Sequence, residues 1–401
     1  MCTNLMLSVP SIPGEDSPPI HVSSRCMEMP GVIEQSLYVM AQGQEFPLWS
    51  APFVPAEQVH EWTSEIDFVG ISPSGETWAS TPNFCDGINS AGLSVGALWL
   101  EPGTDYPLPA QTAGPQVTFL DFPAWVLGTC SVVGDVTAAL VPSDGGQPAF
   151  TVVGPSGDRE QPDSEYFRPL HYIVTDATGA SVIVEFSGGE TQTYSSDNAV
   201  MTNAPTYDWQ LTNVRNYDNV SLVGHATSVT GSGPPVGGSL LGLPGDSLSA
   251  SRFIRAWYLS QGFAQLPADG RGWLPAPGGF DPGKHDPPGF AESDQTAVVV
   301  ALQLVQICMG TPYGMLLERR EDHLGPKVGD YTMWTGVRDH TNVVYYFMSA
   351  FSGILTKIAL ADVDFAGAAA YPHSPSVPVL PQAGLPWCVD ATSMLASADA
   401  P

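Results

Sequence analysis

The sequence opens with Met1-Cys2-Thr3-Asn4-Leu5-Met6-Leu7, in which a cysteine directly follows the initiator methionine. Removal of Met1 would leave Cys2 with a thiol and a free α-amine on one carbon skeleton. An α-amine titrates at roughly 7.7–8.0, so it can accept the thiol proton near neutral pH. The resulting thiolate is the nucleophilic form of cysteine, and N-terminal threonine is activated by its own amine in the same way. The alternative is a cysteine at this position by chance, and the rest of the chain decides between the two.

Length and charge set the first bounds on function. The chain has 401 residues, enough for one large domain or two ordinary ones. Its formal net charge is −28, from 41 acidic and 13 basic residues. Nucleic acids and anionic membrane surfaces require clusters of Lys and Arg, so neither is expected as a partner. No stretch is long and apolar enough to span a membrane. The start shows no secretory signal, which predicts a cytoplasmic protein, or a periplasmic or secreted one if a signal was trimmed.

Familiar site motifs give no support to metal or phosphate chemistry. The six cysteines form no CxxC pair and the histidines show no HExxH spacing, so neither a metal site nor a cofactor is predicted. Residues 278–285 nearly match a phosphate-binding loop, but His285 replaces the required hydroxyl and prolines crowd the segment. Gly92-Leu-Ser-Val-Gly96 spells the G-x-S-x-G nucleophile elbow. The apolar run continues to Leu100, so Ser94 is predicted to be an ordinary strand residue.

Short apolar runs separated by turn residues dominate the first two-thirds of the chain and predict strands. His171–Thr175 and Ser181–Phe186 flank a turn sequence and predict a hairpin. Tyr331–Arg338 and Val343–Met348 predict a second hairpin in the same way.

Helices are fewer. They are expected at 251–262, at 296–309, and within 119–140 with an interruption near Gly128 and a restart at Asp135. Sheets with apolar faces need a covering layer, so helices outside stacked sheets are expected. Residues 366–401 are rich in Pro, Ala and Ser and are predicted to form an extended or disordered tail.

Several longer segments match one family in order. They are Ser24-Arg25-Cys26-Met27-Glu28, Asp86-Gly-Ile-Asn-Ser-Ala-Gly-Leu93, Leu170-His-Tyr-Ile-Val-Thr-Asp-Ala-Thr-Gly179, Met201-Thr-Asn-Ala-Pro205 and Gly242-Leu-Pro-Gly-Asp246-Ser-Leu-Ser-Ala-Ser-Arg252-Phe. With Cys2, these segments resemble the choloylglycine hydrolase family of N-terminal nucleophile hydrolases, which holds penicillin V acylases and conjugated bile salt hydrolases. The resemblance implies an α+β fold, a four-layer αββα sandwich in one catalytic domain over residues 2–365. It also implies autocatalytic exposure of Cys2 and hydrolysis of a linear, non-peptide C–N amide.

The same resemblance assigns roles to individual residues. The active-site Arg of the family falls on Arg25, its acidic partner on Glu28, the oxyanion Asn on Asn203 and a second Arg on Arg252. Trp99 falls where the family uses a backbone N–H and a variable side chain.

Each of these side chains has a chemical use and a plain alternative. Asn203 N–H groups and a backbone N–H near Trp99 would form an oxyanion hole, whereas an isolated Asn of this kind is usually a turn residue. Two Arg near a thiol stabilise the thiolate and can hold a carboxylate, although most Arg make surface ion pairs. Glu28 would orient the charged α-amine, whereas most of the 41 acidic residues must be solvated.

Two departures from the family pattern bear on the substrate. The position of Glu28 is commonly Asp, and that of Trp99 is typically Asn in bile salt hydrolases and Tyr in some penicillin V acylases. A bulky apolar side chain suits an aromatic or aliphatic acyl group better than a hydroxylated sterol, which favours a penicillin V acylase. The alternatives are a bile salt hydrolase, an acylase of N-acyl homoserine lactones, and a binding protein that has kept the fold without activity. The expected partner is a small-molecule amide, and a homo-oligomer (tetramer or dimer) stays open.

Overall fold

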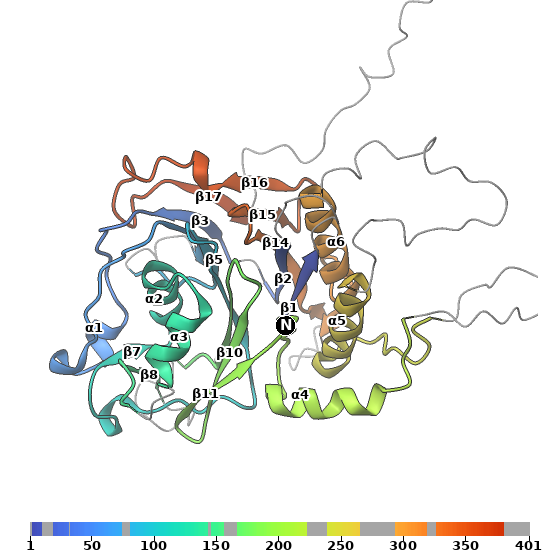
Figure 1. Ribbon diagram of the computed structural model, residues 1–401, viewed down its shortest axis with the longest axis horizontal. Coiled ribbons are helices and arrows are strands. Elements are labelled where there is room, and N and C mark those ends of the chain that lie inside the picture. Colours follow the sequence, from blue (N-terminus) through green and yellow to red (C-terminus); the bar gives the residue numbers. More distant parts are fainter. Residues whose placement is uncertain are drawn as a thin grey trace, which may run out of the picture.

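The computed structural model describes residues 2–9, 19–31, 33–73, 81–142, 146–155, 167–222, 239–264, 293–318 and 326–380. Within these ranges two antiparallel sheets lie face to face, and helices cover the outer side of each (Figure 1). This is the four-layer αββα arrangement that the family resemblance implies. Residues 278–285, the rejected phosphate-loop sequence, lie outside the described residues.

The first sheet carries Cys2 on its edge strand. Its strands run in the order β1 (Cys2–Val9), β2 (Ile20–Met29), β14 (Tyr331–Asp339), β15 (Val344–Ser349) and β16 (Thr356–Ala359). Helices α5 (Ser249–Ala264) and α6 (Ser293–Cys308) pack against β1 and β2. Both helices were expected from the sequence, and α5 turns the buried side chains of Phe253 and Ala256 to the sheet side.

The second sheet is wider. Its order is β11 (Glu190–Ser195), β10 (Ser181–Ser187), β9 (Leu170–Thr175), β6 (Ser94–Trp99), β5 (Asp86–Asn89), β4 (Phe68–Pro73), β3 (Gln35–Met40) and β17 (Ser376–Leu380). Its outer face is covered by α2 (Phe122–Thr129) and α3 (Val133–Leu140), which correspond to the interrupted helical segment predicted within 119–140. The restart is set by Asp135, whose Oδ2 accepts hydrogen bonds from the backbone N–H groups of Ser131 and Val132.

The remaining elements are short. They are α1 (Ser50–Phe53), α4 (Tyr207–Val214), β7 (Gln116–Thr118), β8 (Thr151–Val153), β12 (Leu317–Glu318), β13 (Lys327–Val328) and 3₁₀ turns at Ala56–Gln58, Pro109–Gln111, Arg215–Tyr217 and Leu360–Asp362. Among the described helices, none has the length and apolar character needed to cross a membrane.

Strand alternation divides the second sheet between two apolar cores. Leu98, Ile173 and Ile183 belong to the core shared with the first sheet and with α5 and α6. Val95 and Val174, on the opposite faces of β6 and β9, belong to the core beneath α2 and α3. Polar side chains on the same face as Leu98 therefore point into the space between the sheets, where Cys2 lies.

The predicted hairpins are present, because β9 pairs with β10 and β14 pairs with β15 in antiparallel register. Ser94 is a buried residue at the start of β6, as expected for a strand residue and not for a nucleophile elbow. Gly92, just before β6, has φ +82°, and a Cβ there would lie 2.4 Å from the carbonyl oxygen of His340. Only glycine fits this point of contact between the β5–β6 turn and the β14–β15 turn.

The expected boundary of the C-terminal tail at residue 366 is wrong for the residues that the structure describes. Ser376–Leu380 form β17, which pairs antiparallel with β3 at the edge of the second sheet. Val379 and Leu380 are buried, and the ring of Tyr371 packs edge-on against Tyr38. A proline at 378 is a sequence signal against a strand, but an edge strand tolerates it, and among the described strands β17 pairs only with β3.

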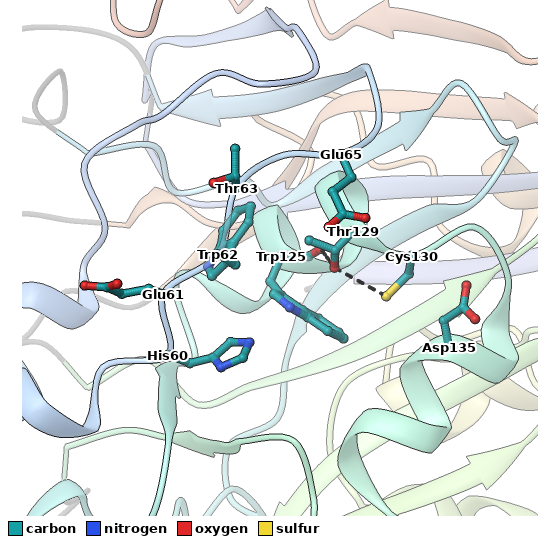
Figure 2. Close-up of a pocket in the computed structure, with 9 residues that line it drawn as sticks. All are labelled: His60, Glu61, Trp62, Thr63, Glu65, Trp125, Thr129, Cys130 and Asp135. Carbon is teal, nitrogen blue, oxygen red and sulfur yellow. Dashed lines mark hydrogen bonds between the residues drawn. The ribbon is translucent and has the colours of Figure 1, made fainter.

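A cavity of about 340 Å³ opens beside α2, on the outer side of the second sheet (Figure 2). None of the candidate site residues named from the sequence lines it. Its walls are His60, Glu61, Trp62, Thr63, Glu65, Trp125, Thr129, Cys130 and Asp135.

Candidate active site

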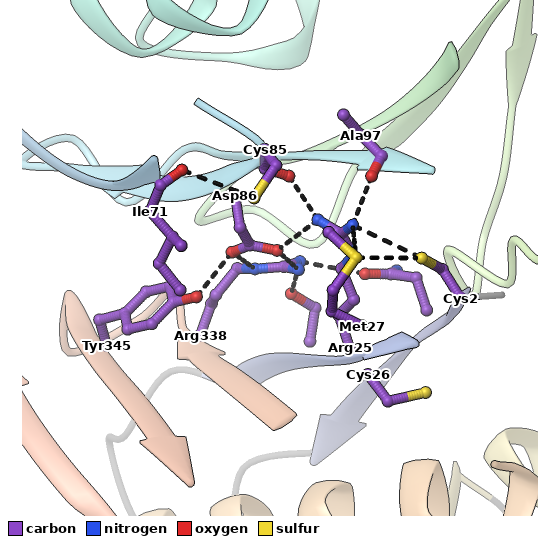
Figure 3. A network of polar contacts seen from close by, with 12 residues as sticks. Cys2, Arg25, Cys26, Met27, Ile71, Cys85, Asp86, Ala97, Arg338 and Tyr345 are labelled. Carbon is purple, nitrogen blue, oxygen red and sulfur yellow. Dashed lines mark hydrogen bonds and ion pairs between the residues drawn. The ribbon is translucent and has the colours of Figure 1, made fainter. Parts of the chain in front are cut away.

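Cys2 begins the edge strand β1 and lies opposite Met27 of β2. Only 3% of its surface is exposed. Its Sγ is 3.5 Å from the Sδ atom of Met27 and 3.8 Å from Nη2 of Arg25 (Figure 3). Arg25 and Met27 are two residues apart on β2, so both side chains point to the same face as the thiol. The strand pattern alone thus places a guanidinium and a thioether against the sulfur of Cys2.

Arg25 is completely buried and is held by several groups. Its Nη1 donates to the carboxylate of Asp86 at 3.0 Å and to the carbonyl of Cys85, and its Nη2 donates to the carbonyl of Ala97. Burial opposes the charge, but the neighbouring Cys2 and Asp86 side chains outweigh burial and raise the pKa of Arg25. The guanidinium is therefore a fixed positive charge beside the thiol.

A second arginine completes this cluster and was not singled out from the sequence. Arg338 on β14 donates from Nε and Nη2 to the two oxygens of Asp86, at 3.0 and 2.7 Å, and Tyr345 OH donates to Asp86 Oδ1 at 2.9 Å. Asp86 thus joins two buried arginines, with Tyr345 as a third donor (Figure 3). The scarcity of basic residues was a usable signal, because a rare Arg in a predicted strand is a candidate for a buried charge.

Asn203 lies in the loop before α4 and is tied to both sheets. Its Oδ1 accepts hydrogen bonds from Cys2 N and from Arg252 Nη2, both at 2.7 Å, and its Nδ2 donates to the carbonyl of Trp99 at 2.7 Å. The two donors and the acceptor fix which way the amide points. One N–H of Nδ2 is used by Trp99, so the amide has a second N–H to offer a substrate.

Arg252 comes from α5 and braces the start of β1. Its Nη1 donates to the carbonyl of Cys2 and to Thr3 Oγ1, and its Nε donates to the carbonyl of Ser247. The side chain is fully buried, as is that of Arg25. Neither guanidinium has an exposed face, so the expectation that these two arginines hold a substrate carboxylate is not met. Their place in the structure is to fix the protein groups around Cys2.

Glu28 lies three residues after Arg25 on β2 and therefore on the opposite face of the strand. Its Oε1 accepts a hydrogen bond from Thr332 Oγ1 at 3.0 Å. Burial raises the pKa of this carboxyl, although the nearby Arg252 acts in the other direction. Its expected role, orienting the α-amine, stays a prediction. Cys2 N donates to Asn203 Oδ1.

Trp99 ends β6 next to Asn203. The group that touches Asn203 is its carbonyl oxygen, and 39% of its surface is exposed. The indole Nε1 donates to Glu101 Oε2 at 3.3 Å. The indole is thus a large apolar surface open to solvent, on a residue whose backbone bonds the proposed oxyanion donor.

The structure brings Cys2, Arg25, Asn203, Arg252 and the backbone of Trp99 into one cluster. Among the described residues, no group of three or more His, Cys, Asp or Glu is arranged to hold a metal ion. The cluster itself offers a thiol, a nitrogen that becomes the α-amine once Met1 is removed, and an amide donor. That set suits attack on a carbonyl carbon.

Comparison with known proteins identifies relatives. A family model described as linear amide C–N hydrolases, choloylglycine hydrolase family, matches residues 11–270. The penicillin V acylase of Pectobacterium atrosepticum is 27% identical over 308 residues, which are 76% of this chain and 69% of that protein. The bile salt hydrolase/transferase of Clostridium perfringens is 27% identical over 267 residues, 65% of this chain and 71% of that protein.

Solved structures share the fold. The mutant C2A conjugated bile acid hydrolase from Clostridium perfringens superposes with a TM-score of 0.66 at 20% identity, covering 94% of this chain and 96% of that one. The penicillin V acylase from Agrobacterium tumefaciens gives a TM-score of 0.59 at 20% identity, covering 92% and 89%. At these identities the likeness shows the fold and leaves the substrate open.

Proposed function

This chain belongs to the choloylglycine hydrolase family of linear amide C–N hydrolases, and from that premise we propose that it cleaves its substrate with Cys2 as an N-terminal nucleophile. One observation carries the proposal. Asn203 Oδ1 accepts from Cys2 N at 2.7 Å, while Cys2 Sγ lies 3.8 Å from the buried Arg25 guanidinium. Nucleophile, base and candidate oxyanion donor are therefore within direct reach of one another.

Arg25 places a fixed positive charge beside the sulfur of Cys2. At an effective dielectric constant of about 20, opposite unit charges about 4 Å apart attract by roughly 4 kcal/mol. Asp86 offsets part of this field, but Arg338 shares the same carboxylate. The two guanidinium groups and the single carboxylate therefore carry one net positive charge beside the sulfur of Cys2.

The reaction then follows from the positions of the groups. The α-amine takes the thiol proton, Sγ attacks the amide carbon, and the second N–H of Asn203 faces the oxygen that becomes negative. The α-amine returns the proton to the leaving amine. Water then cleaves the thioester and releases the acid.

We propose a penicillin V acylase type of specificity, because Trp99, whose backbone carbonyl accepts a hydrogen bond from Asn203, carries an exposed indole. A phenoxyacetyl ring can stack on an indole, and a fatty acyl chain can lie along it. Steroid hydroxyls facing that surface would lose water without gaining partners, at a cost of roughly 1–3 kcal/mol each. The bile salt hydrolase and the acyl homoserine lactone acylase stay as alternatives.

The test is a hydrolysis panel of penicillin V, glycocholate, taurocholate and a long-chain acyl homoserine lactone. We expect a higher kcat/KM for penicillin V or the lactone than for glycocholate, and a shift toward glycocholate in Trp99→Asn. Trp209→Asn, at an exposed tryptophan of α4, is the control and should leave the ratio unchanged. A wild-type preference for glycocholate that Trp99→Asn does not move would favour the bile salt hydrolase.

The non-enzymatic alternative is tested on the same samples. Mass spectrometry should show the loss of one methionine and labelling of Cys2 by iodoacetamide. A chain without turnover on the panel and without a reactive Cys2 would be a binding protein.

A further inference from the structure

A second buried polar cluster lies in the second sheet, away from the thiol. Glu185 on β10 and His171 on β9 are each 2% exposed, and His171 Nδ1 is 3.0 Å from Glu185 Oε1. Both oxygens of Glu185 also accept the backbone N–H of Tyr207, each at 3.1 Å. A buried carboxylate is unfavourable unless its lone pairs are satisfied. Here they are satisfied by the first residue of α4 and by a histidine.

The strand register explains why this carboxylate points toward the active site. Ile183 pairs with Ile173 across the β9–β10 hairpin, so Glu185 and His171, two residues further along each strand, share the face of these isoleucines. His171 in turn pairs with Leu98 of β6. That face lies in the core between the two sheets.

Helix α4 has an N–H group that its own cap does not satisfy. The first N–H groups of a helix have no partner within it, and Thr206, in the N-cap position, makes no side-chain cap hydrogen bond. Glu185 supplies the missing acceptor from 22 residues earlier in the chain. A negative charge at a helix N-terminus is also favoured by the helix dipole.

Tyr207 is four residues from Asn203, so the bond to Glu185 fixes one end of the loop that carries the amide. The other end is held by Met201, whose N–H and carbonyl exchange hydrogen bonds with Asn4 of β1 at 3.0 and 2.8 Å. Between them, Ser249 Oγ donates to the carbonyl of Asn203 at 2.8 Å. Glu185 anchors the α4 end of this loop to the second sheet, the sheet whose Trp99 carbonyl also bonds the Asn203 side chain.

We propose that Glu185 is a positioning residue for amide hydrolysis, which holds the Asn203 loop against the second sheet through the N–H of Tyr207, with His171 orienting the carboxylate. The inference rests on the proposed role of Asn203 as oxyanion donor. The position of the loop depends on the reach of the Glu185 side chain, that is, on how far its carboxylate oxygens extend from β10 toward the N–H of Tyr207. A displacement of about 1 Å in a catalytic group can cost roughly 10²-fold in rate.

Two substitutions separate reach from charge. Glu185→Asp keeps the charge but withdraws the oxygens by one methylene, whereas Glu185→Gln keeps the reach and one acceptor oxygen but removes the charge. Using penicillin V, we expect Glu185→Asp to lower kcat by roughly 10- to 100-fold with KM changed less than about threefold. Glu185→Gln should retain most of the activity. Glu190→Asp and Glu190→Gln, at an exposed glutamate of neighbouring β11, should match the wild type.

Alkylation of Cys2 by iodoacetamide supplies a readout that a general structural defect would move. Alkylation develops no oxyanion, so the Glu185→Asp protein should react with iodoacetamide at the wild-type rate. Equal kcat in Glu185→Asp and wild type would overturn the proposal, as would an equal fractional loss of kcat and alkylation rate, which marks a structural role. If Glu185→Asp does not fold, Glu185→Gln becomes the test. A kcat of Glu185→Gln that is roughly 10-fold below the wild type, with a normal alkylation rate, would show that the charge of Glu185 matters more than its length and would overturn the proposal. A wild-type protein that neither alkylates nor hydrolyses the panel would instead contradict the proposed function.

Discussion

At the scale of single residues, Asn203 is the point where the two sheets and α5 meet. Cys2 N, Arg252 and the carbonyl of Trp99 each form a hydrogen bond with its side chain. The amide therefore cannot rotate by 180° without losing these hydrogen bonds. A donor held in this way before the reaction has little reorganisation to undergo when negative charge develops. The buried Arg25 and Arg252 are also fixed before the reaction, because both bond protein groups and neither faces solvent.

Asn203→Ala should therefore lower kcat by roughly 10²–10³-fold, the usual effect of removing one oxyanion donor. KM should change little, because the oxyanion exists only near the transition state. Steady-state kinetics on the best substrate of the panel is the measurement, and Asn216→Ala, at an exposed asparagine after α4, is the control. Full turnover in Asn203→Ala would place the donor elsewhere.

At the scale of elements, the two sheets are joined at the turn between β14 and β15. His340 is fully buried there, with Nδ1 2.8 Å from the carbonyl of Gly92 and Nε2 2.8 Å from Ser23 Oγ. Burial lowers the pKa of His340 to about 3. The neutral imidazole can donate to the carbonyl and accept from the hydroxyl, so this form links the β5–β6 turn to β2.

The lowered pKa makes this link sensitive to acid. A histidine with a depressed folded-state pKa contributes its full stability above the unfolded value, 6.5, and loses it progressively as the pH falls toward 3. Two pH units below 6.5 the loss reaches roughly 2–3 kcal/mol. His340→Gln cannot titrate, so the Tm difference between wild type and this variant should shrink from pH 7.5 to pH 4.5.

Thermal unfolding at the two pH values measures this difference, with His373→Gln at an exposed histidine as the control. A Tm difference that stays constant across the range would mean that His340 does not carry the acid sensitivity.

At the scale of the whole molecule, the charge balance works against anionic substrates. The formal net charge is −28 with 13 basic residues. Among the basic residues that the structure describes, Arg25, Arg252 and Arg338 are fully buried. Their charge acts mainly inside the cluster around Cys2, whereas the solvated surface repels anions over a Debye length of about 10 Å at 0.1 M salt.

Salt should therefore improve the apparent affinity for charged amides. Between about 20 mM and 500 mM NaCl, KM for penicillin V should fall several-fold, because screening removes the repulsion. KM for an uncharged acyl homoserine lactone is the internal control and should stay within about twofold. A KM for penicillin V that rises with salt would show that the buried arginines dominate the field felt by the substrate.

Much of this molecule was predictable from the sequence, because local patterns determine local structure. Apolar runs with turn residues predicted both hairpins, the helical periodicity predicted α5 and α6, and the matched segments predicted the sandwich and the cluster of Cys2, Arg25, Asn203 and Arg252. Strand alternation could also have placed Glu28 on the face opposite Arg25.

Only the tertiary structure decided which distant groups share a bond. Asp86 and Arg338 are 252 residues apart in the chain, and Glu185 of the second sheet meets Tyr207 at the start of α4. The strand at 376–380 exists because β3 offers an open edge, not because its own sequence demands one. Pairing across sheets depends on register and on the packing of whole layers. The periodicity of apolar residues predicts which side chains share one face of a strand or helix, but it does not predict which element packs against that face.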